Sequence, residues 1–300
     1  MQVGVGLPAN VPGTPGATVV EWARAADQTP LSTLAVIDRI AYGNYEPLVA
    51  LAACAGVTAR IRLATTVLVA PIRHAGLLAK QTASIDALSG GRLTVGFGIG
   101  GREEDYLAAG SRVDFHSRAD HFEEQLEVLR RVWSGQPPVE GVAGVGPPPR
   151  RPGGPEVLIG GYSPRAARRA GRLADGFIAG ALPPARAREL FDEAVAAWRD
   201  AARAGKPRFV GCAYWALGDG ATVERGRDVL RDYYAFAGER AEGIAEQMLA
   251  STEQVRDRLG AAADVGMDEV ILWPCVAELS QLHRLSELVG EWEANHGRLA

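Results

Sequence analysis

The sequence predicts an α/β fold, a closed (β/α)₈ TIM barrel, on three observations. Short β-branched or apolar runs alternate with longer stretches of helical periodicity, and eight such units follow one another along the chain. The length of 300 residues suits one α/β barrel domain, which commonly takes about 250 residues. Hydrophobic residues make up 47% of the chain, enough for a sizeable core. A doubly wound open sheet is the alternative, but it rarely needs eight units.

Each expected strand is a short apolar run that ends at a turn residue. The strands are Gln2–Leu7, Thr33–Asp38, Arg60–Val69, Arg92–Ile99, Glu156–Gly160, Gly176–Ala179, Arg208–Leu217 and Glu269–Trp273. The helices are Val19–Asp27, Pro47–Val57, Gly76–Leu88, Ala119–Trp133, Arg165–Leu173, Pro184–Ala204, two within Thr222–Leu249, Thr252–Val265 with Thr252 as N-cap, and a last one ending near Ala294.

We therefore expect residues 1–300 to form a single domain with one long insertion. The segment Gly135–Pro155, after the fourth strand, is dense in proline and glycine and has no periodicity. Irregular segments of this length in compact domains are usually mobile or functional, so it is expected to be a mobile loop that serves as a lid.

Composition argues against several classes of partner. The formal net charge is −4 and the pI is near 5.8, without a basic run, so neither nucleic acid nor an anionic membrane is expected. Cys54, Cys212 and Cys275 are far apart and form no metal-ligand pattern, which indicates neither disulfides nor a metal site. No secretory signal and no apolar stretch of about 18 residues is visible, and we expect a soluble cytoplasmic protein.

In a barrel, chemistry belongs to the loops at the carboxyl ends of the strands. The run Gly96–Gly101 (GFGIGG) ends the fourth strand, and small residues there let a planar ligand or a phosphate approach the backbone. Its spacing and its place on the fourth strand exclude a Rossmann dinucleotide fingerprint. The alternative is that these glycines only relieve crowding at a corner of the barrel.

A second candidate follows the fifth strand. Gly160 and Gly161 precede Ser163, suited to an N-cap, and Pro164, suited to the first helical position. Backbone N–H groups at such a helix start favour a phosphate. A plain capped helix is the alternative.

Titratable residues near other strand ends are candidates for catalysis. Asp38 ends the second strand and either acts in catalysis or pairs with Arg39 or Arg73. His74 follows the third strand and titrates near neutral pH. The acidic run 103–105 fits a solvated helix start better than a metal site, since no histidine accompanies it. The motifs of serine hydrolases, P-loop enzymes and zinc proteases are absent.

Taken in order, several motifs resemble the bacterial luciferase-like monooxygenase superfamily over most of the chain. The specific block runs from Leu88-Ser89-Gly90-Gly91-Arg92-Leu93 into the glycine loop. Supporting motifs are Pro47–Ala52, Thr58–Val67, Leu78–Gln81, Gly160–Pro164, Ala174–Phe177 and Gly266–Val270.

The resemblance implies a TIM barrel, usually dimeric, that binds reduced FMN or the deazaflavin F420 at its carboxyl-terminal face. Thr66 and Val67 would lie beside the isoalloxazine, joined by the non-prolyl cis peptide that the family often carries. The further cofactor-binding residues that it implies are Gly98, Ile99, Gly100, Gly101, Gly160, Gly161, Tyr162, Ser163 and Pro164, with the phosphate held at positions 160–164.

The chain departs from the family pattern at three places. Arg39 stands where many relatives carry a histidine, Gly98 where luciferases have a cysteine, and Arg102 where an aromatic residue is common. Light emission is therefore not expected. The group that transfers a proton is sought among Asp38, His74 and Tyr106.

Three functions follow from these expectations. The first is a monooxygenase that uses reduced FMN and O₂ on a small organic substrate, with a separate flavin reductase as a possible partner and a homodimer as the expected assembly. The second is hydride transfer with F420, whose acidic tail would need arginines at the pocket mouth; the candidates are Arg39, Arg73, Arg102 and Arg165. The third is a non-catalytic barrel that acts as a binding or partner subunit.

Overall fold

The computed structural model describes residues 1–296, in which eight parallel strands close into a barrel. Each strand pairs with its neighbours in sequence order, and β8 pairs with β1. The strands are β1 (Gln2–Gly6), β2 (Thr33–Val36), β3 (Arg62–Val69), β4 (Leu93–Gly98), β5 (Glu156–Gly160), β6 (Gly176–Ile178), β7 (Arg208–Trp215) and β8 (Glu269–Pro274). Closure confirms the predicted (β/α)₈ fold, because a doubly wound sheet would leave two open edges.

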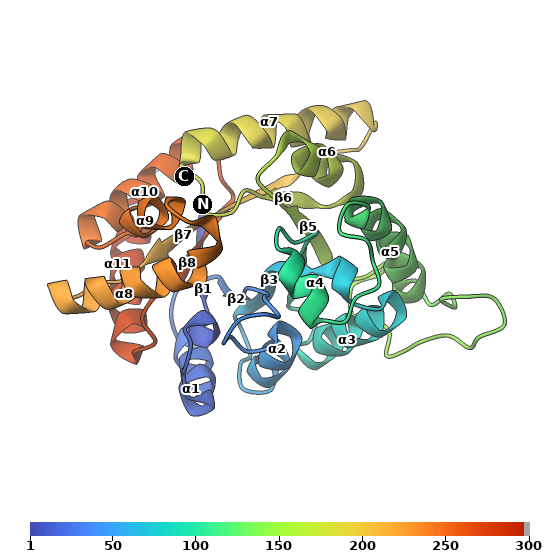
Figure 1. The fold of residues 1–300 in the computed structure, drawn as a ribbon, viewed down its shortest axis with the longest axis horizontal. Helices are drawn as coiled ribbons and strands as arrows, with labels where there is room; N and C mark the ends of the chain where they lie inside the picture. The colour runs from blue at the N-terminus through green and yellow to red at the C-terminus, as the bar shows by residue number, and fades with distance from the viewer. Residues whose placement is uncertain (297–300) are drawn as a thin grey trace.

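The helices form a ring around the strands (Figure 1). They are α1 (Gly16–Asp27), α2 (Pro47–Ala55), α3 (Ala75–Leu88), α4 (Glu103–Ala108), α5 (Arg118–Trp133), α6 (Pro164–Leu173), α7 (Pro184–Asp200), α8 (Gly220–Tyr233), α9 (Arg240–Glu246), α10 (Thr252–Asp264) and α11 (Leu279–His296). Three short 3₁₀ helices are η1 (Pro8–Asn10), η2 (Ala70–Ile72) and η3 (Ala235–Ala237). No helix in residues 1–296 is long and apolar enough to cross a membrane.

The N-cap of α10 is Ser251, so the assignment of this role to Thr252 is wrong. The Ser251 side chain accepts a hydrogen bond of 3.2 Å from the N–H of Gln254, and its backbone is extended, as an N-cap requires. Thr252 already has helical geometry as the first residue of α10. Both residue types cap helices well, and only the backbone conformation separates them.

Side chains fill the barrel, as its closed geometry requires. The interior cluster includes Ala64, Ile178, Val210, Ile271 and Trp273, all buried. The larger apolar cluster lies between the strands and the surrounding helices. At the amino-terminal end of the strands, Arg208 pairs with Glu156 and Glu269, at 2.5 Å in each case. Arg62 also pairs with Glu156, at 3.1 Å, so two arginines balance two glutamates.

The insertion between β4 and β5 lies at the wrong end of the barrel for a lid. Residues 134–155 form neither helix nor strand and extend beyond α5 (Figure 1). They join the end of α5 to the start of β5, opposite the carboxyl ends of the strands. Lys80 of α3 donates to the carbonyl of Gly146, and the N–H of Arg150 donates to Asp86. The lid role is therefore wrong; mobility of the loop stays a prediction.

The contact between α6 and α7 predicts how the fold responds to one methyl group. A Cβ at Gly171 of α6 would lie 2.1 Å from the carbonyl oxygen of Ala194 in α7. We expect Gly171→Ala to lower the free energy of unfolding by about 1–3 kcal/mol, because the two helices must separate. Gly290→Ala in α11 is the control, since a Cβ there meets no atom within 4 Å and helix propensity favours alanine by up to about 1 kcal/mol. Urea denaturation measures both; equal effects of the two substitutions would contradict the packing argument.

Candidate active site

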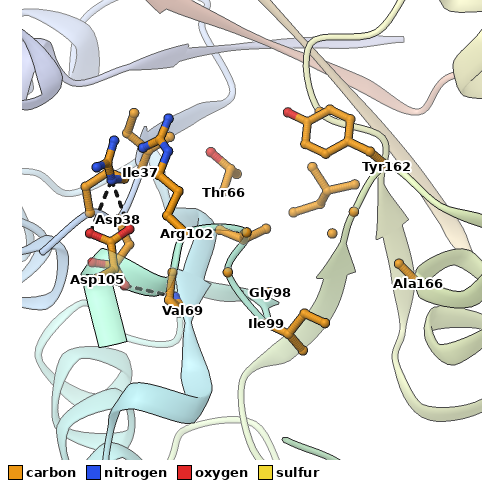
Figure 2. Close-up of a pocket in the computed structure, with 18 of the residues that line it drawn as sticks. Ile37, Asp38, Thr66, Val69, Gly98, Ile99, Arg102, Asp105, Tyr162 and Ala166 are labelled. Carbon is orange, nitrogen blue, oxygen red and sulfur yellow. Dashed lines mark hydrogen bonds and ion pairs between the residues drawn. The ribbon is translucent and has the colours of Figure 1, made fainter. Parts of the chain in front are cut away.

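A cavity of 430 Å³ opens at the carboxyl ends of the strands. Its walls come from the ends of β2 to β7 and from the connections that follow them, and Figure 2 shows Thr66 and Tyr162 on its walls. The volume falls in the range of about 300–1,000 Å³ that small-molecule and cofactor sites occupy. This is the face at which TIM-barrel enzymes carry out their chemistry.

An irregularity in β3 shapes one wall of the cavity. Thr65 pairs with Val95 and Leu68 with Phe97, so β3 carries one residue more than β4 over this stretch, which is a β-bulge. Thr66 and Val67 occupy the bulge and line the cavity, and the peptide bond between them is cis, as expected. The Thr66 hydroxyl oxygen is buried and has no hydrogen-bond partner in the described residues.

The Val67 side chain explains why glycine stands at two of the predicted site positions. A Cβ at Gly98 would lie 2.6 Å from Val67 Cγ2, and a Cβ at Gly160 would lie 2.5 Å from Val67 Cγ1. The Val67 side chain therefore occupies the space that side chains on β4 and β5 would need. Here the interpretation that the glycines relieve crowding holds, although both residues also line the cavity.

The glycine loop after β4 turns tightly and presents its backbone to the cavity. Gly100 has φ +68° and a Cβ there would lie 2.8 Å from Val69 Cγ1, so only glycine fits. A Cβ at Gly101 would meet no atom within 4 Å, which leaves its backbone facing open space. The Tyr106 hydroxyl donates to the carbonyl of Ile99 at 2.6 Å and so holds the loop from behind. Burial raises the pKa of Tyr106 to about 12, which keeps this donor protonated.

The start of α6 has N–H groups that suit an anion. The N–H of Gly161 donates to the carbonyl of Ile178, and that of Ala166 donates to the Ser163 side chain, which caps the helix. Pro164, the first helical residue, has no N–H. The N–H groups of Tyr162, Ser163 and Arg165 have no acceptor in the described residues. Ala166 and Arg169, farther along the same helix, also line the cavity.

Asp38 pairs with Arg73, not with Arg39. Its carboxylate accepts two bonds from the Arg73 guanidinium, at 2.5 and 3.2 Å, and one of 2.8 Å from the N–H of Val69. The side chain of Asp38 is fully buried, and burial raises its pKa against the opposing effect of Arg73. With its oxygen atoms engaged in this way, Asp38 holds the end of β3 in place.

Arg39 forms a second buried ion pair. Its Nε donates to both carboxylate oxygens of Asp105, at 3.2 and 2.9 Å, and its Nη2 lies 2.5 Å from Glu104. Asp105 also accepts from the N–H groups of Ile40 and Ala41. The expectation of a solvated helix start is wrong for Asp105, which is 3% exposed, because Arg39 and two N–H groups replace its hydration. The pair joins the β2–α2 loop to α4, and both residues line the cavity, where Figure 2 shows Asp105.

The connection from β7 to α10 contributes an aromatic wall that sequence reasoning missed. Tyr214 of β7 and Tyr233, Tyr234 and Phe236 of this connection line the cavity. Arg102 donates to the carbonyl of Tyr233 at 3.0 Å, and its guanidinium lies over the Phe236 ring, 3.8 Å from the centroid. The aromatic run at 233–236, next to an amphipathic helix at the catalytic end, was the available signal.

The luciferase-like monooxygenase family model matches residues 1–279. The chain belongs to this family. The members are oxidoreductases that use a flavin or F420.

Solved structures with the same fold include enzymes that differ in cofactor. Monooxygenase RslO1 from Streptomyces bottropensis superposes with a TM-score of 0.77 at 20% identity, covering 99% of each chain. An F420-dependent secondary alcohol dehydrogenase gives 0.75 at 15% identity, covering 91% of this chain and 93% of that one. The oxygenating constituent of 3,6-diketocamphane monooxygenase of Pseudomonas putida, in complex with FMN, gives 0.72 at 15% identity, covering 96% of both.

Most of the predicted site residues of this family member lie together. The cavity is lined by Asp38, Thr66, Val67, Gly98, Ile99, Gly100, Gly101, Gly160, Gly161, Tyr162 and Ser163. His74, Tyr106 and Pro164 do not line it. His74 is exposed and stands at the N-cap position of α3. Among residues 1–296 no group of three or more His, Cys, Asp or Glu side chains is placed to hold a metal ion.

The ion pair of Asp38 predicts a coupled response to mutation. Arg73→Gln leaves a buried, uncompensated carboxylate, and we expect a loss of about 3–5 kcal/mol in unfolding free energy at pH 7. The double variant Arg73→Gln/Asp38→Asn should recover part of this loss, because the buried charge is gone. A double variant as unstable as the sum of the single variants would contradict the pairing.

The pH dependence of stability follows from the same group. Because the folded pKa of Asp38 is raised, the folded chain binds this proton more tightly than the unfolded chain. The contribution of Asp38 to the free energy of unfolding therefore declines as the pH rises from about 4, the usual pKa of an aspartate, through the raised pKa of the folded chain. We expect Asp38→Asn to remove this decline of stability with pH. Arg73→Gln should extend the decline to higher pH, because the pKa of Asp38 rises further without the arginine. Urea denaturation across pH 4 to 8 measures both effects.

Proposed function

We propose that this chain is a flavin-dependent monooxygenase that uses reduced FMN and O₂ to oxidise a small organic substrate. The observation that carries the proposal is the pairing of arginines around the cavity. Arg39 is neutralised by Asp105 and Glu104, and Arg73 by Asp38 and Glu46. Arg102 is engaged with the aromatic wall. Of the four arginines considered for the acidic tail of F420, only Arg165 is left without an ion pair or an aromatic contact in the described residues, whereas FMN brings a single phosphate.

The residues at β3 and β4 fit an isoalloxazine ring. The buried Thr66 hydroxyl lacks a partner, and the polar edge of a flavin ring offers both donors and acceptors to such a group. Val67, Ile99 and the open backbone at Gly101 would contact the ring faces and edges. Close approach of a planar ligand is possible here because Gly98, Gly100 and Gly101 carry no Cβ.

The start of α6 fits the FMN phosphate. The N–H groups of Tyr162, Ser163 and Arg165 are free to donate, and the helix dipole favours an anion at this end. Arg169 lines the cavity one to two turns farther along the helix and adds positive charge, although Glu123 pairs with it at 2.8 Å.

In this proposal the protein positions and shields the reactants. When bound, reduced FMN would supply the electrons that activate O₂ for transfer of an oxygen atom to the substrate. The chain would hold the cofactor against β3 and β4 and exclude water with the aromatic wall of the β7–α10 connection. A homodimer, a separate flavin reductase that supplies reduced FMN, and a cytoplasmic location belong to the same proposal. The match to the luciferase-like monooxygenase family argues against a barrel without catalysis.

Riboflavin, which lacks the phosphate, provides a direct test of the phosphate site. We expect FMN to bind at least about tenfold more tightly than riboflavin, because the phosphate gains charge-assisted hydrogen bonds at α6. Arg169→Gln should lower the ratio of the FMN affinity to the riboflavin affinity. Arg186→Gln, which removes an exposed arginine of α7 paired with Glu189, should leave it unchanged.

Fluorescence titration measures these affinities, and F420 is titrated in parallel. Oxygen uptake with reduced FMN and candidate substrates then tests turnover. The proposal fails if FMN does not bind below about millimolar, equivalent to about −4 kcal/mol, or if F420 binds more tightly than FMN.

The unpaired Thr66 hydroxyl predicts opposite effects on binding and stability. Thr66→Val keeps the shape and removes a buried polar group without a partner, so stability without cofactor should stay equal or rise. The affinity for FMN should fall about tenfold. Thr65→Val is the matched control, because Thr65 Oγ1 donates to the carbonyl of Gly96 at 2.8 Å. That control should lose stability by about 1–3 kcal/mol. Loss of stability without loss of FMN affinity in Thr66→Val would speak against a flavin contact.

A further inference from the structure

The charged side chains that line the cavity are already satisfied, which restricts what substrate can bind. Asp38 and Asp105 are each paired with an arginine, and Arg169 is paired with Glu123. Arg102 donates to the Tyr233 carbonyl and stacks on aromatic rings. A charged substrate would have to break one of these pairs or remain unpaired in the cavity. The cavity therefore favours a neutral substrate.

The wall from the β7–α10 connection presents aromatic rings to that substrate. Tyr233 and Tyr234 meet edge to face, with centroids 5.0 Å apart, and Tyr234 lies 5.9 Å from Phe236. Tyr162 adds a further ring to the lining of the cavity and is 62% exposed. Aromatic side chains bind flat rings by offset stacking and edge contacts. Such a wall favours a planar aromatic molecule over a flexible chain.

Two tyrosine hydroxyls form the polar part of this wall. The hydroxyls of Tyr214 and Tyr234 lie 2.8 Å apart and share one hydrogen bond. Burial raises the pKa values of Tyr214 and Tyr234 well above the usual value near 10, so both remain protonated at neutral pH.

The number of hydroxyl protons shows which substrate group this wall can bind. The two hydroxyls carry two protons, and the contact between them uses one of these. The other hydroxyl proton has no acceptor in the described residues. That proton suits an acceptor oxygen on the ligand.

We propose that Tyr214 and Tyr234 bind an oxygen substituent of a neutral, planar aromatic substrate, and that the β7–α10 connection thereby sets substrate specificity. This inference rests on the proposed function, since it takes the rest of the cavity to be occupied by the flavin. Tyr214 and Tyr234 are recognition residues here: they orient the substrate oxygen, and the rings around them hold its plane.

Two probes that differ in one hydroxyl group test the proposal. 1-Naphthol and naphthalene are titrated by calorimetry into the full chain loaded with oxidised FMN, after FMN binding has been measured separately. We expect the parent chain to prefer 1-naphthol about tenfold, because one hydrogen bond distinguishes the probes. Tyr214→Phe and Tyr234→Phe should each reduce this preference, and the double variant should abolish it while naphthalene binds as before.

Tyr42→Phe is the matched control. Its hydroxyl donates to Asp232 at 2.9 Å and does not line the cavity, so this variant should keep the full preference. Unchanged naphthalene binding in each variant shows that the cavity is intact. The inference is overturned if the parent shows no preference, if it binds neither probe, or if the double variant keeps the preference. Absence of FMN binding to the parent chain would instead contradict the proposed function.

Discussion

The extra residue of β3 is the constraint on which the rest of the site depends. It brings Thr66 and Val67 into the cavity, and the Val67 side chain then fills the space beside Gly98 on β4 and Gly160 on β5. The Val67 side chain of β3 thus determines which residues fit at the facing positions of β4 and β5. Because any Cβ at either glycine would overlap Val67, the bulge and both glycines must occur together. The cavity wall that suits a flat ring is a consequence of this packing.

Buried ion pairs then fix the loops that surround this wall. Asp38 with Arg73 holds the end of β3, and Arg39 with Asp105 joins the β2–α2 loop to α4. Buried pairs of this kind add little net stability, but loss of one partner is costly, which makes them effective as positional constraints. They also leave hydroxyl and N–H donors, rather than free charges, to face a ligand. Arg39 acts in this network and thus has a structural role.

The architecture was accessible from the sequence because it depends on local pattern. Eight apolar runs and the helices between them predicted the closed barrel, since periodicity reports directly which faces are buried. The glycine loop at Gly98–Gly101 and the helix start at Ser163 were also found, because glycine positions and capping residues have local conformational meaning. Boundaries were less accurate, as the choice between Ser251 and Thr252 shows, because two adjacent residues can both cap a helix.

The sequence by itself determined the barrel, the face that carries the site and eleven of the residues that line it. Only the tertiary structure decided that Asp38 pairs with Arg73, that His74 does not line the cavity, and that the aromatic wall comes from residues 214–236. It also placed the long loop 134–155 at the opposite end of the barrel. The physical reason is that pairing and orientation depend on contacts between residues far apart in the chain. Strand and helix formation depend mainly on neighbours.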